Sequence, residues 1–305
     1  MGRRKRSYRQ VDGILPLDKP VGISSNEALQ QVKRLYKAQK AGHTGSLDPI
    51  ASGLLLICLG EATKVSPFLL EADKHYHTLA RLGVRTETGD AEGAVVEECP
   101  VGEYSAADIE QALERFRGEI QQVPPMYSAL KHKGVRLYEL ARQGVEVERQ
   151  PRTVHIYELK VLERGPDTLS LDIQCSKGTY IRTLVEDLGE VLGCGAHVAA
   201  LRRVGVGPYT EQDMVSLEEL NALAEQDRSA LEARLRPIDS ALADWPAVRL
   251  DGELSYFVKS GQAVWVPGAP SSGMVRMYDD QDLFLGAGRI LDDGRVAPKR
   301  LIKGA

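Results

Sequence analysis

The sequence predicts an α+β fold in which helices pack on a mixed, largely antiparallel sheet, followed by a small C-terminal β-barrel-like domain. Apolar and polar residues alternate over 75–84 and again over 169–176, which is the pattern of half-buried strands. Amphipathic helices are predicted after three serine caps, Ser24, Ser105 and Ser216. Beyond Pro246 the pattern changes to short strand candidates separated by glycine- and aspartate-containing turns.

Length and composition are those of a globular protein with ample core. The chain has 305 residues, 43% hydrophobic and 27% charged, which suits one large domain and a small one. Its four cysteines include no Cys-x-x-Cys pair, which argues against a zinc site or a disulfide framework and favours a reducing cytosol. No apolar run approaches the ~20 residues of a membrane span, and the basic N-terminus lacks the apolar segment of a secretory signal.

Charge is unevenly distributed along the chain. The formal net charge is −4, but the charged side chains of residues 1–10 are all basic, namely Arg3, Arg4, Lys5, Arg6 and Arg9. The C-terminal end is also basic, whereas residues 211–244 contain nine acids against three bases. Such segregation can create positive patches on an acidic protein, and phosphate binding depends on local patches. We expect the N-terminal cluster to add non-specific phosphate contacts; solvated termini are the alternative.

The remaining elements follow in chain order. A short apolar strand at 14–17 precedes the helix that Ser24 and Glu27 begin, and a strand at 94–98 follows the alternating stretch 75–84. The helix that begins after Ser105 is expected to stop at Gly118. In the rest of the main body we expect strands at 154–163, 169–176 and 197–206, and helices after 180 and after 216. In the C-terminal domain we expect a helix at 251–261 and strands at 263–266, 275–278, 283–290 and 296–302.

The stretch 121–152 differs from the regular elements on either side. It opens with Pro124-Pro125 and is rich in basic side chains, Lys131, His132, Lys133, Arg136, Arg142, Arg149 and Arg152. A long insertion between regular elements is usually functional or disordered. The apolar positions 137, 140 and 141 predict one short helix within it.

The chain is most unusual over 42–53, a glycine-rich loop followed by a continuous apolar run. Asp48 lies where the loop meets the run, and Pro49 restricts it to an extended backbone. The glycines of the loop allow backbone angles and close approaches that a side chain would forbid. The pattern therefore predicts a carboxylate held at the edge of a core within a cleft. A turn capped by Asp48 is the alternative for the Asp-Pro pair taken alone.

The run Gly-His-Thr-Gly-Ser-Leu-Asp-Pro, followed by Ala-Ser-Gly-Leu-Leu, resembles the catalytic motif of the TruB family of tRNA pseudouridine synthases. The resemblance extends over nearly the whole chain. It implies an isomerase that converts the uridine at T-arm position 55 of tRNA to pseudouridine, with a flipped-out base and an aspartate nucleophile. It also implies that 121–152 is a thumb loop that closes over RNA, and that the C-terminal domain is an RNA-binding domain of the PUA type.

The reaction defines which side chains are needed. Moving uracil from an N1–C1′ to a C5–C1′ bond requires no redox change, metal or cofactor, but it requires a carboxylate near C1′ and C6. Asp48 is the candidate, and whether it attacks C1′, adds to C6 or acts through a glycal stays open. A nearby guanidinium favours the ionised form of such a carboxylate. Arg182, in Gly178-Thr179-Tyr180-Ile181-Arg182-Thr183-Leu184, matches the family's arginine for that role.

The resemblance also assigns residues around the substrate. Tyr76 matches the base-stacking tyrosine, a candidate for handling the C5 proton, and Tyr180 matches a second tyrosine that packs under the base. Leu201 matches a leucine whose backbone contacts the flipped uracil, and His43 matches the residue that enters the vacated stack. Without the resemblance, an inward tyrosine on a strand is usually a core residue and a loop histidine faces solvent.

Lys19 and Lys64 are expected to approach phosphates. We predict a catalytic domain at 1–247, with the thumb insertion at 121–152, and a PUA-type domain at 248–305. We expect a cytoplasmic monomer that binds the T-arm and T-loop of tRNA, with no metal, no cofactor, no membrane and no guide RNA.

Four other interpretations remain open. The chain could be an RNA-binding chaperone for which catalysis matters less, or a guide-RNA-dependent relative of the dyskerin type. A glycoside hydrolase is the remaining enzymatic alternative, but no second carboxylate occurs in a matching motif. The C-terminal domain could be a purely structural cap.

Overall fold

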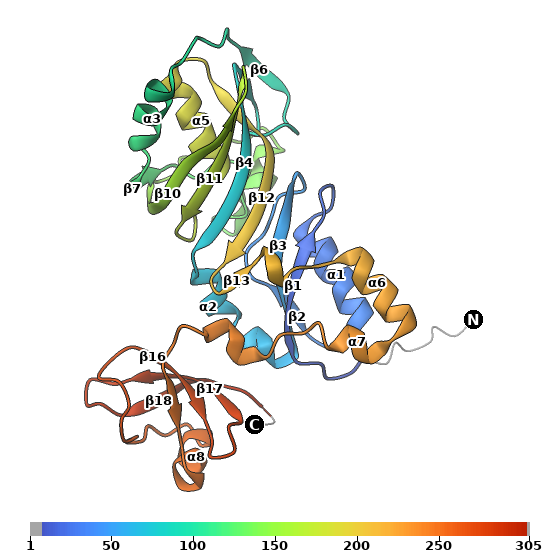
Figure 1. Ribbon diagram of the computed structural model, residues 1–305, viewed down its shortest axis with the longest axis vertical. Coiled ribbons are helices and arrows are strands. Elements are labelled where there is room, and N and C mark those ends of the chain that lie inside the picture. Colours follow the sequence, from blue (N-terminus) through green and yellow to red (C-terminus); the bar gives the residue numbers. More distant parts are fainter. Residues whose placement is uncertain (1–7, 304–305) are drawn as a thin grey trace. The chain divides into compact units, whose positions relative to one another are not determined.

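The computed structural model describes residues 8–303, and these divide into two compact units (Figure 1). The first unit contains the described residues up to Leu47, Gly53–Glu71 and the residues from Val206 onward. The second contains Asp48–Ser52 and Ala72–Gly205. Among the described residues no helix combines the length and the apolar character needed to cross a membrane. The basic residues Arg3 to Arg6 of the predicted N-terminal cluster lie outside the described residues.

A small sheet forms the core of the first unit. Strand β1 (Gly13–Lys19) pairs antiparallel with β3 (Ala51–Leu59) and parallel with β14 (Val215–Ser216). Strand β2 (Ala41–His43) pairs antiparallel with the last three residues of β3. β3 is the apolar run of the sequence motif, and its residues from Leu54 to Leu59 are fully buried. The motif therefore leads directly into the core, as predicted, and the structure shows that the apolar run is a strand.

Helices pack beside this sheet (Figure 1). Helix α1 (Ser25–Tyr36) begins at the predicted capping box, in which the Glu27 backbone N–H donates to the Ser24 hydroxyl at 3.2 Å and the Ser24 backbone N–H donates to the Glu27 carboxylate at 2.7 Å. The fully buried Tyr36 donates its hydroxyl to the Leu231 carbonyl at 2.7 Å, which joins α1 to α7. The other helices of this part are α2 (Ser66–Glu71), α6 (Leu217–Gln226), α7 (Arg228–Glu232) and three 3-10 turns, Gly60–Lys64, Glu211–Asp213 and Ile238–Leu242.

The C-terminal stretch forms a four-stranded sheet with α8 (Gly252–Lys259) packed on it. Its strand order is β15 (Ala247–Arg249), β16 (Met274–Tyr278), β17 (Phe284–Ile290) and β18 (Val296–Leu301). The apolar side chains that fill it form a cluster of their own, Val248, Leu250, Val258, Val264, Val275, Met277, Leu285, Ile290 and Val296. The strand expected at 263–266 is reduced to one bridge, between Val264 and Val296. β15 was not predicted, because its three residues become a strand only by pairing with β16.

The second unit is built on a larger sheet with the strand order β12-β4-β11-β10-β7. The strands are β4 (Lys74–Leu82), β7 (Gly118–Gln122), β10 (Arg152–Arg164), β11 (Thr168–Cys175) and β12 (Ala196–Val206). β11 pairs antiparallel with both β4 and β10, and β10 pairs antiparallel with β7. β4, β10, β11 and β12 match the four strands expected in this part of the sequence, with small shifts at their ends, whereas β7 was not predicted.

Helices α3 (Ala106–Glu114) and α5 (Ile181–Leu192) cover one face of this sheet (Figure 1). α3 begins at the predicted Ser105 cap but ends at Glu114, and Gly118 opens β7 instead of ending the helix. On β4 the side chains of Tyr76, Thr78, Ala80 and Leu82 are buried, whereas those at 75, 77, 79 and 81 are half-buried or exposed. The sheet therefore has a covered face and an open face, and α5 brings Arg182 to the covered one.

Two hairpins and a short helix complete the second unit. β5 (Val84–Thr86) pairs with β6 (Val95–Glu98), and β8 (Lys131–His132) pairs with β9 (Val135–Arg136). The second hairpin lies in the predicted insertion 121–152 and is followed by α4 (Leu137–Ala141), the one short helix expected there.

Candidate active site

Asp48 lies in the loop between β2 and β3, where the chain turns into the buried strand. Its carbonyl accepts a hydrogen bond from the Ala51 backbone N–H at 3.0 Å, which closes a turn through Pro49 and Ile50. The Asp48 side chain is 44% exposed. The local sequence thus fixes the backbone of Asp48 while leaving its carboxylate accessible to a substrate.

Arg182 lies in the first turn of α5, and its guanidinium is almost fully buried. It contacts the Asp48 carboxylate at 3.0 Å and donates to the backbone carbonyls of Thr88 and Tyr127 at 2.8 and 2.7 Å. A second carboxylate, that of Asp90, lies 3.5 Å from its Nη1 atom. Because these acceptors surround the guanidinium, its position is fixed. A fixed opposite charge at this distance favours the ionised form of Asp48.

Asp90 lies in the turn between β5 and β6, and the structure places it beside Arg182. Its side chain is 5% exposed, and its Oδ1 atom accepts hydrogen bonds from the Thr88 hydroxyl at 2.5 Å and the Glu92 backbone N–H at 3.2 Å. The Thr86 hydroxyl donates to the Asp90 carbonyl at 2.7 Å. A second carboxylate is therefore present next to Arg182. It is buried and held by its own turn, so it is not placed as the general acid of a glycoside hydrolase.

Both predicted tyrosines lie within the second unit, and the pKa of each phenol is affected by the Asp48 charge. Tyr76 is 9% exposed on the covered face of β4, and burial raises the pKa of its phenol, with the Arg203 guanidinium acting in the opposite direction. Tyr180 is the N-cap of α5, and burial likewise raises its pKa, while the Ser128 hydroxyl lowers it. The Asp48 carboxylate contributes to raising the pKa of both phenols. Both tyrosines are therefore neutral at physiological pH and available as stacking faces.

Gln122 is a residue of the site that the sequence did not reveal. Its buried amide receives a hydrogen bond from the Tyr180 backbone N–H at 2.8 Å and donates one to the Tyr180 carbonyl at 3.0 Å. This pair of bonds fixes the backbone of Tyr180 one residue before α5 begins. No motif marks a glutamine at the end of a strand, so only the tertiary arrangement identifies this role.

Leu201 is half-buried on β12, next to Ala200. The Ala200 carbonyl accepts a hydrogen bond from the Thr78 hydroxyl at 2.9 Å, which joins β12 to the covered face of β4 two residues from Tyr76. The structure thus places Leu201 on the strand beside the one that carries Tyr76. The contact of its backbone with uracil stays a prediction.

The other three predicted binding residues lie in the first unit. His43 is the last residue of β2 and pairs with Ile57. Lys19 is fully buried at the end of β1, and its ammonium donates to the carbonyls of Pro20 and Ile23, each at 2.8 Å. Lys64 donates to the Leu301 carbonyl at 2.7 Å and pairs with Glu61 at 2.5 Å. Both ammonium groups are engaged within the fold, and their approach to phosphates stays a prediction.

The insertion 121–152 begins inside the site and continues as a basic surface. Gln122 and Tyr127 contact Tyr180 and Arg182 through the hydrogen bonds described above. Further along, the guanidinium carbons of Arg136 and Arg142 lie 5.8 and 5.5 Å from the centre of the Tyr138 ring. The segment therefore joins the Asp48–Arg182 pair directly to exposed arginines.

Three family models match consecutive parts of the chain. Residues 33–181 match the N-terminal domain of TruB family pseudouridylate synthases. Residues 182–243 match the tRNA pseudouridylate synthase B C-terminal domain, and residues 246–302 match a model described as pseudouridine synthase II TruB, C-terminal. Fold and site thus define a pseudouridylate synthase.

Relatives of known name resemble the chain over almost its full length. A tRNA pseudouridine synthase B of Nitrosococcus oceani is 57% identical over 300 residues, which cover 98% of this chain and 97% of the relative. A protein of the same name from Coxiella burnetii is 55% identical, with coverage of 97% and 96%. The chain belongs to the TruB family of pseudouridylate synthases.

Two solved structures share the fold. One is a Cbf5-Nop10-Gar1 complex, with a TM-score of 0.75 and 26% identity, covering 99% of this chain and 91% of the matched chain. The other is an H/ACA RNP bound to a substrate RNA that contains 2′-deoxyuridine, with a TM-score of 0.73 and 25% identity, covering 95% and 84%.

Proposed function

We propose that this protein isomerises the uridine at position 55 of the tRNA T-arm to pseudouridine. The observation that carries the proposal is the 3.0 Å contact between the accessible Asp48 carboxylate and the buried Arg182 guanidinium, in a chain of the TruB family. The relatives named tRNA pseudouridine synthase B, with 54% to 57% identity, support the substrate.

The reaction conserves all atoms of the substrate. The N1–C1′ bond breaks, the uracil turns, a C5–C1′ bond forms, and the proton on C5 leaves while N1 gains one. Asp48 acts as the nucleophile, by attack on C1′, by addition to C6, or as the base that gives a glycal. Arg182 keeps it ionised and fixed in position, because its guanidinium is itself held by two backbone carbonyls.

The uridine must leave its stack to reach Asp48, which costs a few kcal/mol. Tyr76 and Tyr180 offset part of this cost, since stacking on an aromatic face contributes about 1–3 kcal/mol per base. Tyr76 is also the candidate that handles the C5 proton. We assign the backbone of Leu201 to the flipped uracil and His43 to the vacated position in the T-loop.

RNA contacts outside the site are assigned to two regions. The basic insertion 121–152 acts as the thumb that closes over the T-arm, and residues 248–305 form a PUA-type RNA-binding domain following a catalytic domain at 1–247. The apolar cluster drawn entirely from the C-terminal stretch supports this division. In this proposal the protein acts as a cytoplasmic monomer directly on tRNA, without a guide RNA, a metal or a cofactor in the reaction.

The test compares wild type with Asp48→Asn on an unmodified tRNA transcript, measuring pseudouridine formation and tRNA binding separately. Asp167→Asn is the matched control, because Asp167 forms an exposed ion pair with Arg81 at 2.6 Å in the same unit. We expect Asp48→Asn to bind tRNA but to form no pseudouridine, while Asp167→Asn remains active. A wild type that binds the transcript and forms no pseudouridine would favour the RNA chaperone or the guide-RNA-dependent interpretation.

A further inference from the structure

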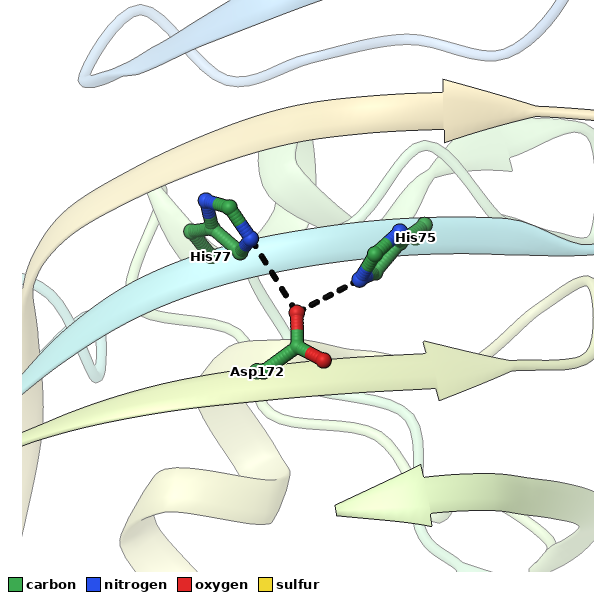
Figure 2. Close-up of side chains that lie close together, drawn as sticks. All are labelled: His75, His77 and Asp172. Carbon is green, nitrogen blue, oxygen red and sulfur yellow. Dashed lines mark hydrogen bonds and ion pairs between the residues drawn. The ribbon is translucent and has the colours of Figure 1, made fainter. Parts of the chain in front are cut away.

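Three potential metal ligands converge on the open face of the sheet in the second unit. Figure 2 shows His75 and His77 on β4 and Asp172 on β11, with their side chains directed toward one another. The two histidines are separated by one residue, so they project from the same face of the strand. Asp172 is the register partner of His77. The ligand atoms of all three side chains lie within 4.8 Å of one another.

One carboxylate oxygen serves both imidazoles. The Oδ1 atom of Asp172 lies 2.5 Å from Nε2 of His75 and 3.1 Å from Nε2 of His77. The two rings meet edge to face, with centroids 5.5 Å apart. The histidine side chains are 34% and 42% exposed, whereas Asp172 is 14% exposed. The cluster is therefore largely buried at Asp172 and open to solvent at the two imidazoles.

We propose that His75, His77 and Asp172 bind a divalent transition-metal ion of the Zn²⁺ class, with water in the remaining coordination position. Two imidazoles and a carboxylate are ligands that Zn²⁺ accepts readily, whereas Mg²⁺ prefers oxygen alone. Bonds of about 2.0–2.2 Å to a tetrahedral ion separate neighbouring ligand atoms by roughly 3.3 Å. The two pairs that involve Asp172, now at 2.5 and 3.1 Å, would therefore move slightly apart on binding. On binding, Nε2 of each neutral imidazole gives its lone pair to the metal while the ring proton resides on Nδ1, and the ion replaces the hydrogen bonds to Asp172.

The backbone preorganises this cluster. The pairing of β4 with β11 runs without a register shift from Arg81 and Thr168 to Lys74 and Cys175. Positions fixed by a continuous ladder lose little conformational entropy when their side chains converge on an ion.

The neighbouring strand β10 contributes charged groups that engage one another. Lys160, the register partner of Asp172 on that strand, forms an ion pair with Glu158. The Gln174 amide also donates to Glu158, at 2.9 Å. Lys160 and Gln174 are thus directed toward Glu158. The Oδ1 atom of Asp172 is directed at the two imidazoles instead.

The proposed metal site lies on the opposite face of β4 from Tyr76 and the proposed active site, and it is separate from that site. Tyr76 stands between the two histidines in sequence and points to the covered face, so a metal bound here would join β4 to β11 on the side away from the substrate. The proposal goes beyond the isomerase function and does not depend on it. It can therefore be tested without RNA.

The test is a Zn²⁺ titration of the untagged, metal-free full chain against a chromophoric chelator. We expect one Zn²⁺ per chain, no competition by millimolar Mg²⁺, and a loss of affinity in His77→Gln and in Asp172→Asn that exceeds the ~10–100-fold caused by removing an outer-shell partner. His155→Gln is the matched control, since His155 is an exposed histidine on β10 whose ring lies 4.7 Å from that of Tyr157. Equal Zn²⁺ affinity in wild type, His77→Gln and Asp172→Asn would overturn the proposal.

A second measurement requires no variant and guards against misfolding of the substituted chains. In wild type, Zn²⁺ should shift the imidazole resonances of His75 and His77 in the NMR spectrum and leave that of His155 in place. It should also slow amide hydrogen exchange in β4 and β11, because the ion links the two strands. Zn²⁺ binding that leaves both imidazoles unshifted would place the ion elsewhere and reject the site.

Discussion

Two carboxylates from two different loops contact the same guanidinium, and their surroundings are opposite. Asp48 lies in the loop that leads into β3 and is 44% exposed, whereas Asp90 lies in the turn between β5 and β6 and is 5% exposed. Asp90 accepts hydrogen bonds from Thr88 and Glu92 within its own turn.

The difference is the one expected between a reacting carboxylate and a supporting one. A carboxylate whose oxygens are engaged by its own turn cannot move toward a substrate, but it can compensate the charge of a buried arginine. An accessible carboxylate on a rigid backbone can meet a sugar or a base. Arg182 connects the two, so substitutions on either side of it should have separable effects on stability and on turnover.

The largest effect is expected when Arg182 itself is removed. Arg182→Met leaves Asp90 buried without its cation and Asp48 without its partner. We expect turnover to fall on the order of 10³-fold and the free energy of unfolding to fall by about 3–5 kcal/mol. Single-turnover assays and urea unfolding measure the two. Arg182→Lys serves as the control, because it keeps the charge but cannot reproduce the forked contacts; unchanged stability in Arg182→Met would show that Asp90 does not depend on it.

The next effect distinguishes the two carboxylates directly. Asp90→Asn removes a buried charge that accepts several hydrogen bonds, so we expect a loss of ~1–3 kcal/mol of stability and a reduction in turnover of up to about 10²-fold through misplacement of Arg182. Asp48→Asn should change stability by less than ~1 kcal/mol, since its ion pair is half-exposed, and should abolish turnover. If both variants lose the same stability and the same turnover, the division of roles is wrong.

The elements that carry the site were predictable because local signals specify them. The Ser24 capping box is present at the start of α1, and the alternation from 75 to 84 places Tyr76 on the covered face of β4. Asp48 was identified through a long motif and Arg182 through the family resemblance of a separate segment, 178–184, and the structure places them 3.0 Å apart.

What the sequence did not reveal depends on contacts between distant segments. Asp90 lies 92 positions before Arg182, and a bridge to Val198 joins its turn to β12. Gln122 acts on Tyr180 across 58 positions. Neither Asp90 nor Gln122 lies in a motif or a periodic pattern that signals its role. The histidines of β4 were likewise read only as the outward half of an alternating strand, since their partner Asp172 lies 97 positions from His75.

A smaller effect is expected from substituting Gln122, which holds the backbone of Tyr180 in place. Gln122→Met keeps the length of the side chain and removes both hydrogen bonds to Tyr180. We expect a cost of ~1–3 kcal/mol in stability and a few-fold lower turnover with weaker tRNA binding. The adjacent Gln121→Met is the matched control, because the Gln121 amide bonds only the exposed Thr153 hydroxyl, at 2.8 Å, among the contacts that the described residues show. Equal effects of the two substitutions would show that Gln122 has no positioning role.

The smallest effect concerns a third carboxylate, Glu186, one helical turn beyond Arg182. Burial raises the pKa of Glu186 above its ordinary value of 4.5, Arg182 lowers it, and Asp187 and Asp90 raise it further. Because the folded state holds this proton more tightly than the unfolded state, the stabilisation is present below pH 4.5 and is lost as the pH rises through the folded pKa. At neutral pH the ionised side chain therefore opposes folding.

Glu186→Gln should accordingly be more stable than wild type at pH 7, by less than ~1 kcal/mol because the group is partly exposed. The difference should shrink toward zero at pH 4, where the wild-type side chain is protonated. Urea unfolding at both pH values measures it. A variant less stable than wild type at pH 7 would mean that Glu186 acts with Asp90 as a second buried anion for Arg182, and that the support of the guanidinium is shared by two acids.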